Sequence, residues 1–413
     1  MNDIVCCSFC DSKSMVKIID FGRVALAGGF LLPDEFAQEK TYPLRLFFCE
    51  NCYAVQVIDK VNESVLFKDY FYFSSAIETL RKHFNAYAIE ISNRFLGDGC
   101  KSVLEFGCND GVLLKPLADL GIKTLIGVDP ASNVVGSIND SRIKIINNFF
   151  NESIANEVIE NYGKVDVVVA NNVYAHIPDM KGITRAICQV LADDGVFIFE
   201  VHYLGSLIDE LQYDMIYHEH LYYHSLVSLA EFFKHFGLII FDVKPVPTHG
   251  GSMRFYICKD GGKYSASISA AVVKLRNEEI AAGFKLKDTF LKFASEVETR
   301  KNQLLTVLND LKSQGKTIAG YGASGRANTM LQYCGIDRMQ MDYMIDDAPA
   351  KWGYYTPGTH FRIYPSSIMV ENSPPDYLLI FAWSFYDEIS KKCSNFINGG
   401  GKFIIPLPVI KII

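Results

Sequence analysis

The chain has 413 residues, which is long enough for two or three domains. Hydrophobic residues make up 49% of it, a fraction that supports well-filled cores and excludes the disordered and fibrous classes. The formal net charge is -7, so the chain has no overall attraction for nucleic acid or anionic lipid, and we expect neither as a partner.

The start of the chain and its cysteines bear on the cellular compartment. Residues 1–4 lack the basic region and the apolar run of a secretory signal, and no apolar segment is long enough to span a bilayer. We therefore expect a cytoplasmic protein that does not enter a membrane. In that compartment the eleven cysteines are expected to stay reduced and available for metal, rather than to form disulfides.

Two C-x2-C pairs near the N-terminus, Cys7 with Cys10 and Cys49 with Cys52, predict a zinc site. Each pair can place two thiolates on one turn, and two such turns complete a tetrahedron of four sulfurs. A closed site of this kind is structural, because it leaves no position for substrate or water. Cys6 is a spare thiol that can replace Cys7. Ordinary buried thiols, or a zinc module for nucleic acid, are the weaker alternatives.

The middle of the chain predicts a doubly wound α/β sheet. Buried strands are expected over 102–106, 124–128, 166–170 and 195–200, with helices between them. A glycine turn over 107–111 follows the first strand and leads into a helix near Val112, and its glycines allow a ligand to approach the backbone closely. Asp129 ends the second strand, at the spacing expected for a carboxylate that accepts hydrogen bonds from ribose hydroxyls.

The glycine turn resembles the first motif of class I S-adenosylmethionine-dependent methyltransferases, because its pattern is E-x-G-x-x-x-G rather than G-x-G-x-x-G. In that interpretation Glu105 orients the turn and Gly107 lets the methionine part of the cofactor approach. An NAD(P) site and a purely structural turn are the alternatives. His176 follows the third strand and can reach a ligand at the carboxyl ends of the strands, or it is a capping or exposed loop histidine.

Residues 217–220 read Tyr-His-Glu-His and combine two imidazoles, a carboxylate and a phenol. Such a cluster is costly to bury unless each polar group has a partner. Beside a cofactor site it indicates group transfer to a substrate that first loses a proton.

The C-terminal part predicts a long amphipathic helix over 286–313 and strands at 316–320, 341–347, 377–381 and 402–405. The first of these strands is followed by a glycine-rich turn and a helix from about Arg326. A strand, a glycine turn and a helix N-terminus form a natural phosphate site. The alternative is a second Rossmann-like half that only packs against the first.

Taken together, these motifs resemble the S-adenosylmethionine-dependent NDP-sugar C-methyltransferases, such as the 3-C-methyltransferases of mycarose and tetronitrose biosynthesis. The resemblance covers nearly the whole chain in the order of the family, through the two C-x2-C pairs, 70–75, 105–111, 171–179, 217–220, 249–254, 320–329, 346–347 and 355–360. The chain departs from the family pattern at 325–328, where the glycine has moved, and at Cys108, where a serine or another small residue is expected.

The resemblance implies three domains: a zinc-binding domain over 1–68, a class I methyltransferase Rossmann-like domain over 69–248, and a C-terminal α/β domain over 249–413 that contributes to nucleotide-sugar binding. It implies S-adenosylmethionine and structural zinc as cofactors. It also implies methylation at C3 of a nucleotide-linked 4-keto-6-deoxyhexose. An O- or N-methyltransferase, a non-catalytic nucleotide-sugar binding protein and a dehydrogenase remain alternatives. The nucleotide is open, and an acidic chain of this kind can be a monomer.

The resemblance also assigns roles to single residues. His220 is the base, Glu219 orients an imidazole or holds a sugar hydroxyl, and Tyr217 and His176 steady the enolate oxygen. The residues expected to bind the cofactor are Glu105, Gly107, Asn109, Gly111, Asp129, Asn171, Tyr72 and Ser75. The residues expected to bind the substrate are Tyr70, His249, Arg254, Tyr321, Ser324, Arg326 and Asn328. The residues expected to bind zinc are Cys7, Cys10, Cys49 and Cys52.

Overall fold

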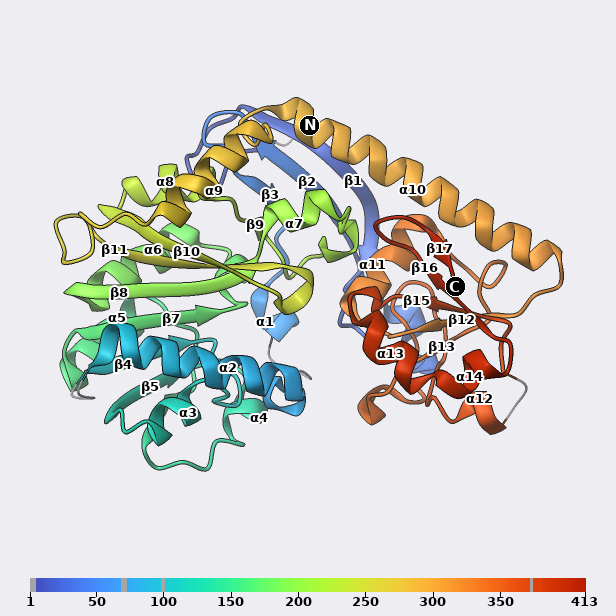
Figure 1. Ribbon diagram of the computed structural model, residues 1–413, viewed down its shortest axis with the longest axis horizontal. Coiled ribbons are helices and arrows are strands. Elements are labelled where there is room, and N and C mark those ends of the chain that lie inside the picture. Colours follow the sequence, from blue (N-terminus) through green and yellow to red (C-terminus); the bar gives the residue numbers. More distant parts are fainter. Residues whose placement is uncertain (1–4, 68–72, 98–100, 372–373) are drawn as a thin grey trace.

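The computed structural model describes residues 5–67, 73–97, 101–371 and 374–413, which form three β-sheets with their helices (Figure 1). Within these ranges no helix combines the length and the apolar character that a membrane crossing requires. One continuous hydrophobic core contains residues from all three sheets, among them Phe48, Phe199 and Leu379. The three sheets therefore share buried surface, and side chains from all of them can meet at one site.

The N-terminal sheet is antiparallel, with the strand order β1-β2-β3-β9. Its first three strands are β1 (Met15–Ala25), β2 (Thr41–Cys49) and β3 (Val55–Val57), and a short helix α1 (Glu63–Phe67) follows. The fourth strand, β9 (Tyr222–Tyr223), comes from the central domain, because Tyr222 pairs with Gln56 and Tyr223 pairs with Val55. No sequence pattern predicted this two-residue strand, which places residues 217–220 beside the N-terminal domain.

The central sheet has seven strands in the order β10-β11-β8-β7-β4-β5-β6, and confirms the expected class I methyltransferase Rossmann-like fold. Its parallel strands are almost wholly buried, as expected for a sheet covered by helices on both faces. Only β11 runs antiparallel, between β8 and β10. The strands are β4 (Ser102–Phe106), β5 (Thr124–Val128), β6 (Ile143–Ile146), β7 (Val165–Asn171), β8 (Leu191–His202), β10 (Leu238–Val246) and β11 (Ser252–Lys259).

Helices of the central domain pack against this sheet. In α6 the buried residues Met180, Ile183 and Ile187 form one apolar face, and the Asp179 side chain caps the helix by accepting from the Gly182 amide. The helices are α2 (Glu78–Ile91), α3 (Leu114–Asp119), α4 (Ser132–Val135), α5 (Glu152–Tyr162), α6 (Met180–Val190), α7 (Leu204–Asp209), α8 (Leu226–Lys234) and α9 (Ala270–Ala281).

The expected boundary at residue 249 does not coincide with a break in the central sheet. β11 begins after it and pairs with β8, residue Ser252 with His202. The central sheet therefore continues to Lys259, and the change to the C-terminal domain comes after this strand. The long helix α10 (Lys287–Ser313), expected over 286–313, then packs on β1 and α11 and leads across to the C-terminal domain (Figure 1).

The C-terminal sheet has the order β14-β13-β12-β15-β16-β17 and is parallel except for β17. Its strands are β12 (Ile318–Tyr321), β13 (Tyr343–Ile345), β14 (Ile363–Tyr364), β15 (Tyr377–Ile380), β16 (Lys402–Ile405) and β17 (Lys411–Ile412). Its helices are α11 (Gly325–Cys334), α12 (Ile368–Glu371), α13 (Tyr386–Lys392) and α14 (Ser394–Asn398). The expected glycine turn and helix after β12 are present.

Candidate active site

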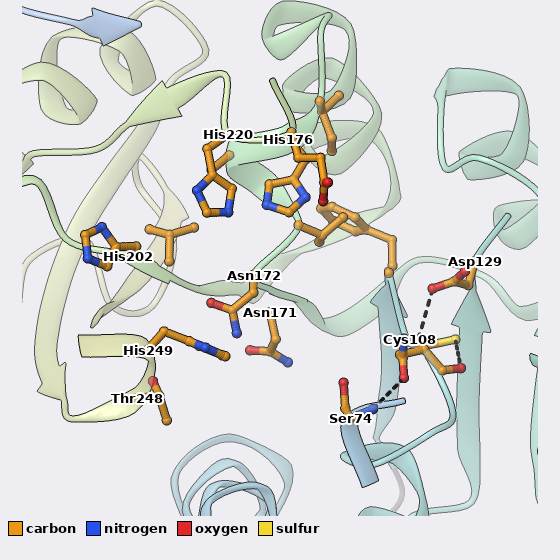
Figure 2. Close-up of a pocket in the computed structure, with 18 of the residues that line it drawn as sticks. Ser74, Cys108, Asp129, Asn171, Asn172, His176, His202, His220, Thr248 and His249 are labelled. Carbon is orange, nitrogen blue, oxygen red and sulfur yellow. Dashed lines mark hydrogen bonds between the residues drawn. The ribbon is translucent and has the colours of Figure 1, made fainter. Parts of the chain in front are cut away.

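A cavity of about 1280 Å³ lies between the central and C-terminal domains. One side is formed at the carboxyl ends of β4, β5 and β7, where a ligand site is expected in an open α/β sheet. Figure 2 shows Ser74, Cys108 and Asp129 on one side of this cavity and His202, His220 and His249 on the other. We call the first side, defined by Glu105, Asn109, Asp129 and Asn171, the acidic end. We call the second side, defined by His176, His202, His220 and His249, the imidazole end.

The glycine turn at the acidic end requires its glycine. Gly107 has φ of +67°, and a Cβ there would lie 2.8 Å from the Val173 side chain. The Asp129 carboxylate accepts from the backbone amides of Asn109 (3.0 Å) and Ala131 (2.9 Å), which fixes its position after β5. Burial raises the pKa of Asp129, and both oxygens can still accept further hydrogen bonds.

Two buried oxygen atoms at the acidic end have no hydrogen-bond partner among the described residues. They are Oε2 of Glu105 and Oδ1 of Asn171, whose side chains are joined by a 2.9 Å hydrogen bond from the Asn171 amide to Glu105 Oε1. Burial, more than any other influence, raises the pKa of Glu105 to about 8. An α-ammonium group at this place would donate to these oxygens and favour the ionised form of Glu105, so it fits here. The acidic end therefore fits S-adenosylmethionine.

At the imidazole end, His220 is held in one tautomer. Its Nδ1 lies 2.8 Å from the carbonyl oxygen of Met215, which can only accept, so Nδ1 carries the hydrogen. Its Nε2 then carries no hydrogen, and the Nε2 lone pair accepts a hydrogen bond from the Tyr217 hydroxyl at 2.9 Å. Burial lowers the pKa of His220 to about 4, so the ring is neutral at pH 7. His176 lies beside it, with ring centroids 5.0 Å apart, and burial also lowers its pKa.

The two remaining members of the segment 217–220 differ from each other. Glu219 lines the cavity, and burial raises its pKa to about 7. His218 is buried outside the cavity, where its Nε2 donates to the carbonyl of Pro43 at 3.0 Å. Because the segment is irregular rather than extended, His218 and His220 face different surroundings.

The C-terminal domain supplies the far wall of the imidazole end. Ser324 caps α11 by accepting from the Ala327 amide at 3.3 Å, and Ser324, Gly325 and Arg326 all line the cavity. The Arg326 guanidinium donates to both carboxylate oxygens of Asp214 (2.9 and 3.2 Å), and the Trp383 indole donates to the same carboxylate at 3.0 Å. Asp214 is fully buried, and it directly precedes the Met215 carbonyl that holds His220.

Several residues expected to bind cofactor or substrate do not line the cavity. Gly111 and Ser75 are not among its lining residues: Gly111 has φ of +75°, and the Ser75 amide donates to Asp110 at 3.1 Å. Asn328 donates to the Ala27 carbonyl, and Tyr321 donates to Asp347 at 2.7 Å. The expected residues Tyr70 and Tyr72 lie outside the described part of the chain.

Arg254 also lies away from the cavity. Its guanidinium is buried between Glu200 (2.9 Å) and Glu90 (3.0 Å), and its charge lies over the Tyr87 ring. Glu200 in turn contacts His83 at 3.0 Å and Thr248 at 2.9 Å, and these last two residues line the cavity. Arg254 therefore supports the cavity wall through Glu200 rather than contacting a ligand there.

Three cavity or support residues were missed by the sequence analysis: His202, His83 and Asp214. His202 ends β8, so the rule that ligands bind beyond the carboxyl ends of strands would have found it. His83 lies on α2 with no motif around it. The role of Asp214 depends on Arg326, which is 112 residues away.

The four expected zinc ligands come together at one end of the N-terminal sheet. Their sulfurs all lie within 4.8 Å of one another, with Cys7 and Cys52 at 3.5 Å and Cys10 and Cys49 at 3.6 Å. A tetrahedral zinc with Zn–S bonds of about 2.3 Å places its sulfurs about 3.8 Å apart, so the cluster fits this ion. Cys6 is exposed and stands outside the cluster, which selects Cys7.

Comparisons with known proteins agree with this architecture. Family models match in three consecutive parts: "Putative zinc binding domain" over 7–67, "Methyltransferase domain" over 80–242 and "C-methyltransferase C-terminal domain" over 247–408. C-methyltransferase NovU of Streptomyces niveus is 31% identical over 98% of this chain and 96% of its own length.

Other similar proteins match only part of this chain. A ubiquinone biosynthesis O-methyltransferase of Methylobacterium nodulans is 33% identical over 23% of this chain and 39% of its own length. The solved structure of the CcbJ methyltransferase from Streptomyces caelestis covers 43% of this chain and 89% of its own, with 13% identity and a TM-score of 0.34.

Proposed function

We propose a substrate and a mechanism for this chain, which belongs to the family of S-adenosylmethionine-dependent C-methyltransferases that includes NovU. The proposed reaction adds a methyl group to a carbon beside the ketone of a nucleotide-linked 4-keto-6-deoxyhexose, with C3 as the expected position. The observation that carries the proposal is the neutral His220 imidazole. Its Nε2 lone pair and the Tyr217 hydroxyl lie together in the cavity that also contains the acidic end.

The acidic end is the proposed cofactor site. Glu105 and Asn171 would hold the α-ammonium group, and Asp129 would accept from the ribose hydroxyls. When bound, S-adenosylmethionine supplies an electrophilic methyl group to a carbon nucleophile and leaves as a neutral thioether.

His220 is the proposed general base. The 4-ketone acidifies the neighbouring C–H bond, the proton passes to His220 Nε2, and the electron pair delocalises onto the ketone oxygen as an enolate. In the ligand-free protein the pKa of about 4 keeps the ring unprotonated at neutral pH, and Nε2 becomes available when the Tyr217 hydroxyl turns to the enolate oxygen. The hydrogen bond from Nδ1 to Met215 stabilises the imidazolium that results. Tyr217 and His176, whose rings both lie beside the His220 ring, are the proposed donors to the enolate oxygen.

The nucleotide part is proposed to lie against the C-terminal wall. The N-terminus of α11 offers backbone amides at Gly325 and Arg326, and the guanidinium of Arg326 adds positive charge there. The four-cysteine cluster is proposed to hold a structural zinc with no part in the reaction, because the site leaves no open coordination position.

The test is mass spectrometry of reactions with S-adenosylmethionine and a panel of dTDP- and GDP-4-keto-6-deoxyhexoses. The expected result is a gain of one methyl group on a keto-sugar and none on its 4-hydroxy analogue. Both C3 and C5 flank a 4-ketone, and NMR of the product identifies the carbon. Deuterium exchange at that carbon without cofactor separates carbon methylation from O- or N-methylation. Cofactor binding without any methylated keto-sugar would overturn the proposal.

A further inference from the structure

The His202 side chain at the imidazole end offers an unused hydrogen-bond acceptor. His202 ends β8 and lines the cavity, with His220, His249 and Arg326 as its electrostatic neighbours. Its Nδ1 is buried and has no hydrogen-bond partner among the described residues. Among the described residues, His218 and His224 also have a buried ring nitrogen without a partner, but neither lines the cavity. His202 does line it, so a ligand there can supply the missing partner.

The tautomer of His202 follows from its neighbour Gln212, which is fully buried. The Gln212 amide nitrogen donates to the Glu210 carboxylate at 2.8 Å and to the Gly250 carbonyl at 2.7 Å. Both of these groups can only accept, so the amide nitrogen and oxygen cannot exchange places. The Gln212 oxygen therefore faces His202 Nε2, at 2.9 Å, and Nε2 must carry the hydrogen.

In this tautomer Nδ1 carries no hydrogen and has a lone pair that can accept a hydrogen bond. Burial also lowers the pKa of His202 to about 3, so the ring does not take up a second hydrogen at neutral pH. The support is rigid, because Gly250 approaches Gln212 so closely that a Cβ at Gly250 would lie 3.0 Å from the Gln212 oxygen. A fixed lone pair in a buried wall selects a ligand group that donates a hydrogen bond.

We propose that His202 Nδ1 accepts a hydrogen bond from a hydroxyl or amino group on the hexose ring, and so selects acceptors that carry a donor at that position. The inference rests on the proposed function, because it takes the keto-hexose as the occupant of the imidazole end. His202 thereby differs from His220, whose lone pair already meets the Tyr217 hydroxyl. In this scheme His220 removes a proton from the substrate, whereas His202 accepts a hydrogen bond from a hydroxyl or amino group that stays protonated.

The first test compares binding of dTDP-4-keto-6-deoxyhexoses with that of analogues in which one ring hydroxyl at a time is replaced by fluorine, which cannot donate. Calorimetry in the presence of S-adenosylhomocysteine makes the comparison independent of turnover. The wild-type protein should bind one hydroxyl compound about 10- to 100-fold more tightly than its fluoro analogue, since an unpaired buried acceptor is costly. His202→Leu should lose that preference. His202→Asn, which keeps an acceptor near the Nδ1 position, should retain part of it.

The outcomes separate the two proposals. Equal binding of every hydroxyl and fluoro pair by the wild-type protein, or a preference that survives in His202→Leu, overturns the role of His202. Tight, selective binding without methyl transfer overturns the proposed reaction and supports the role of His202. Absence of binding by the whole panel overturns both.

A second readout observes the ring nitrogen itself. In protein labelled with ¹⁵N-histidine, His202 Nδ1 should resonate as an unprotonated nitrogen, with His202→Asn giving the assignment. The signal should shift when the preferred hexose binds, and it should stay in place when the fluoro analogue binds. A protonated Nδ1 in the free protein would contradict the tautomer and the inference.

Discussion

The acidic end and the imidazole end of the cavity are assembled in different ways. At the acidic end, Glu105, Asp129 and Asn171 end or follow strands of one sheet, and the strand register makes them neighbours. At the imidazole end, the side chains come from separate loops and short turns and, for His202, from the end of β8. The loop that holds His220 is itself fixed by the C-terminal domain, because Asp214 binds Arg326. One end is thus a property of a single domain, whereas the other needs all three domains in place.

This difference separates binding of the cofactor from the reaction with the acceptor. In the proposed function, buried carboxyl groups with raised pKa values bind the cationic cofactor at the acidic end, and neutral imidazoles with lowered pKa values bind the acceptor at the other end. Changes at one end should therefore leave the function of the other end nearly intact. The following experiments test that separation.

Replacement of His220 by Asn should have the largest effect on turnover. Loss of a positioned general base typically costs about 10²- to 10⁴-fold in rate, and kcat should fall by that amount. The affinity for S-adenosylhomocysteine, measured by calorimetry, should stay within about twofold, because His220 lies at the opposite end from the glycine turn.

His218→Asn is the matched control for His220. His218 belongs to the same segment but is buried against Pro43, outside the cavity, so its loss should lower the melting temperature more than kcat. Near-normal turnover of His220→Asn would reassign the base, with His176 as the first candidate.

Replacement of Cys49 by Ser should weaken the imidazole end through the N-terminal sheet. The Gln56 side chain donates to Cys7 Sγ at 3.1 Å, and the Gln56 backbone pairs with Tyr222 in β9. Leu221 accepts from the Val57 amide at 2.8 Å, and its own amide donates to the Ala175 carbonyl at 3.0 Å. Loss of the metal should reduce kcat/KM for the keto-sugar by roughly 10- to 100-fold, as for changes that disturb a metal site.

The same variant should retain its affinity for S-adenosylhomocysteine, because none of the four clustered cysteines lines the cavity that contains the glycine turn. Cys6→Ser removes an exposed thiol outside the cluster and serves as the control, with unchanged metal content and melting curve. Unchanged metal content in Cys49→Ser itself would refute the zinc assignment.

Replacement of Glu105 by Gln tests the acidic end. A hydrogen bond to a charged group contributes roughly 1.5–3 kcal/mol, so the affinity for S-adenosylmethionine should fall about 10- to 100-fold. Glu219→Gln is the matched exchange at the other end and should alter the affinity for the keto-sugar instead. Equal effects of both variants on both ligands would show that the two ends are not separable.

The pH dependence of stability gives the smallest effect. The pKa of Glu105 is raised from 4.5 to about 8, so above pH 7 the folded protein keeps a proton that the unfolded chain has already lost. The free energy of unfolding should therefore fall as the pH rises from 7 to 8, by up to about 1.4 kcal/mol per pH unit. Chemical denaturation of ligand-free protein measures this slope.

Glu105→Gln should flatten the slope between pH 7 and 8. Glu219→Gln should act mainly below pH 7, because the pKa of Glu219 is raised only to about 7. The buried histidines do not interfere in this window, since both the usual imidazole pKa of 6.5 and the lowered value of His220 lie below it. An unchanged slope in Glu105→Gln would show that Glu105 is ionised in the folded protein.

At the acidic end the sequence predicted the residues and the strands that carry them, whereas at the imidazole end it predicted His176, His220 and His249 but not His202. Buried parallel strands have continuous apolar runs, so the bounds of β4 and β5 were predicted to the residue, and Glu105 and Asp129 were placed with them. His202 has no motif, and its tautomer depends on Gln212 and Gly250 together. The expected substrate roles of Arg254, Tyr321 and Asn328 came from motif order alone, which does not reveal whether a side chain faces the cavity or a neighbouring carboxylate or carbonyl.

The short strand β9 has a consequence for the order in which the chain can fold. The edge of β3 stays unpaired until Tyr222 and Tyr223 are available. A large part of the central domain lies between β3 and these two residues in the sequence. During synthesis on the ribosome, the metal-binding turns can therefore form early, while their sheet stays open at one edge. The N-terminal region reaches its final form only as the neighbouring segment 217–220 does, so a fragment that ends before β9 lacks part of its own fold.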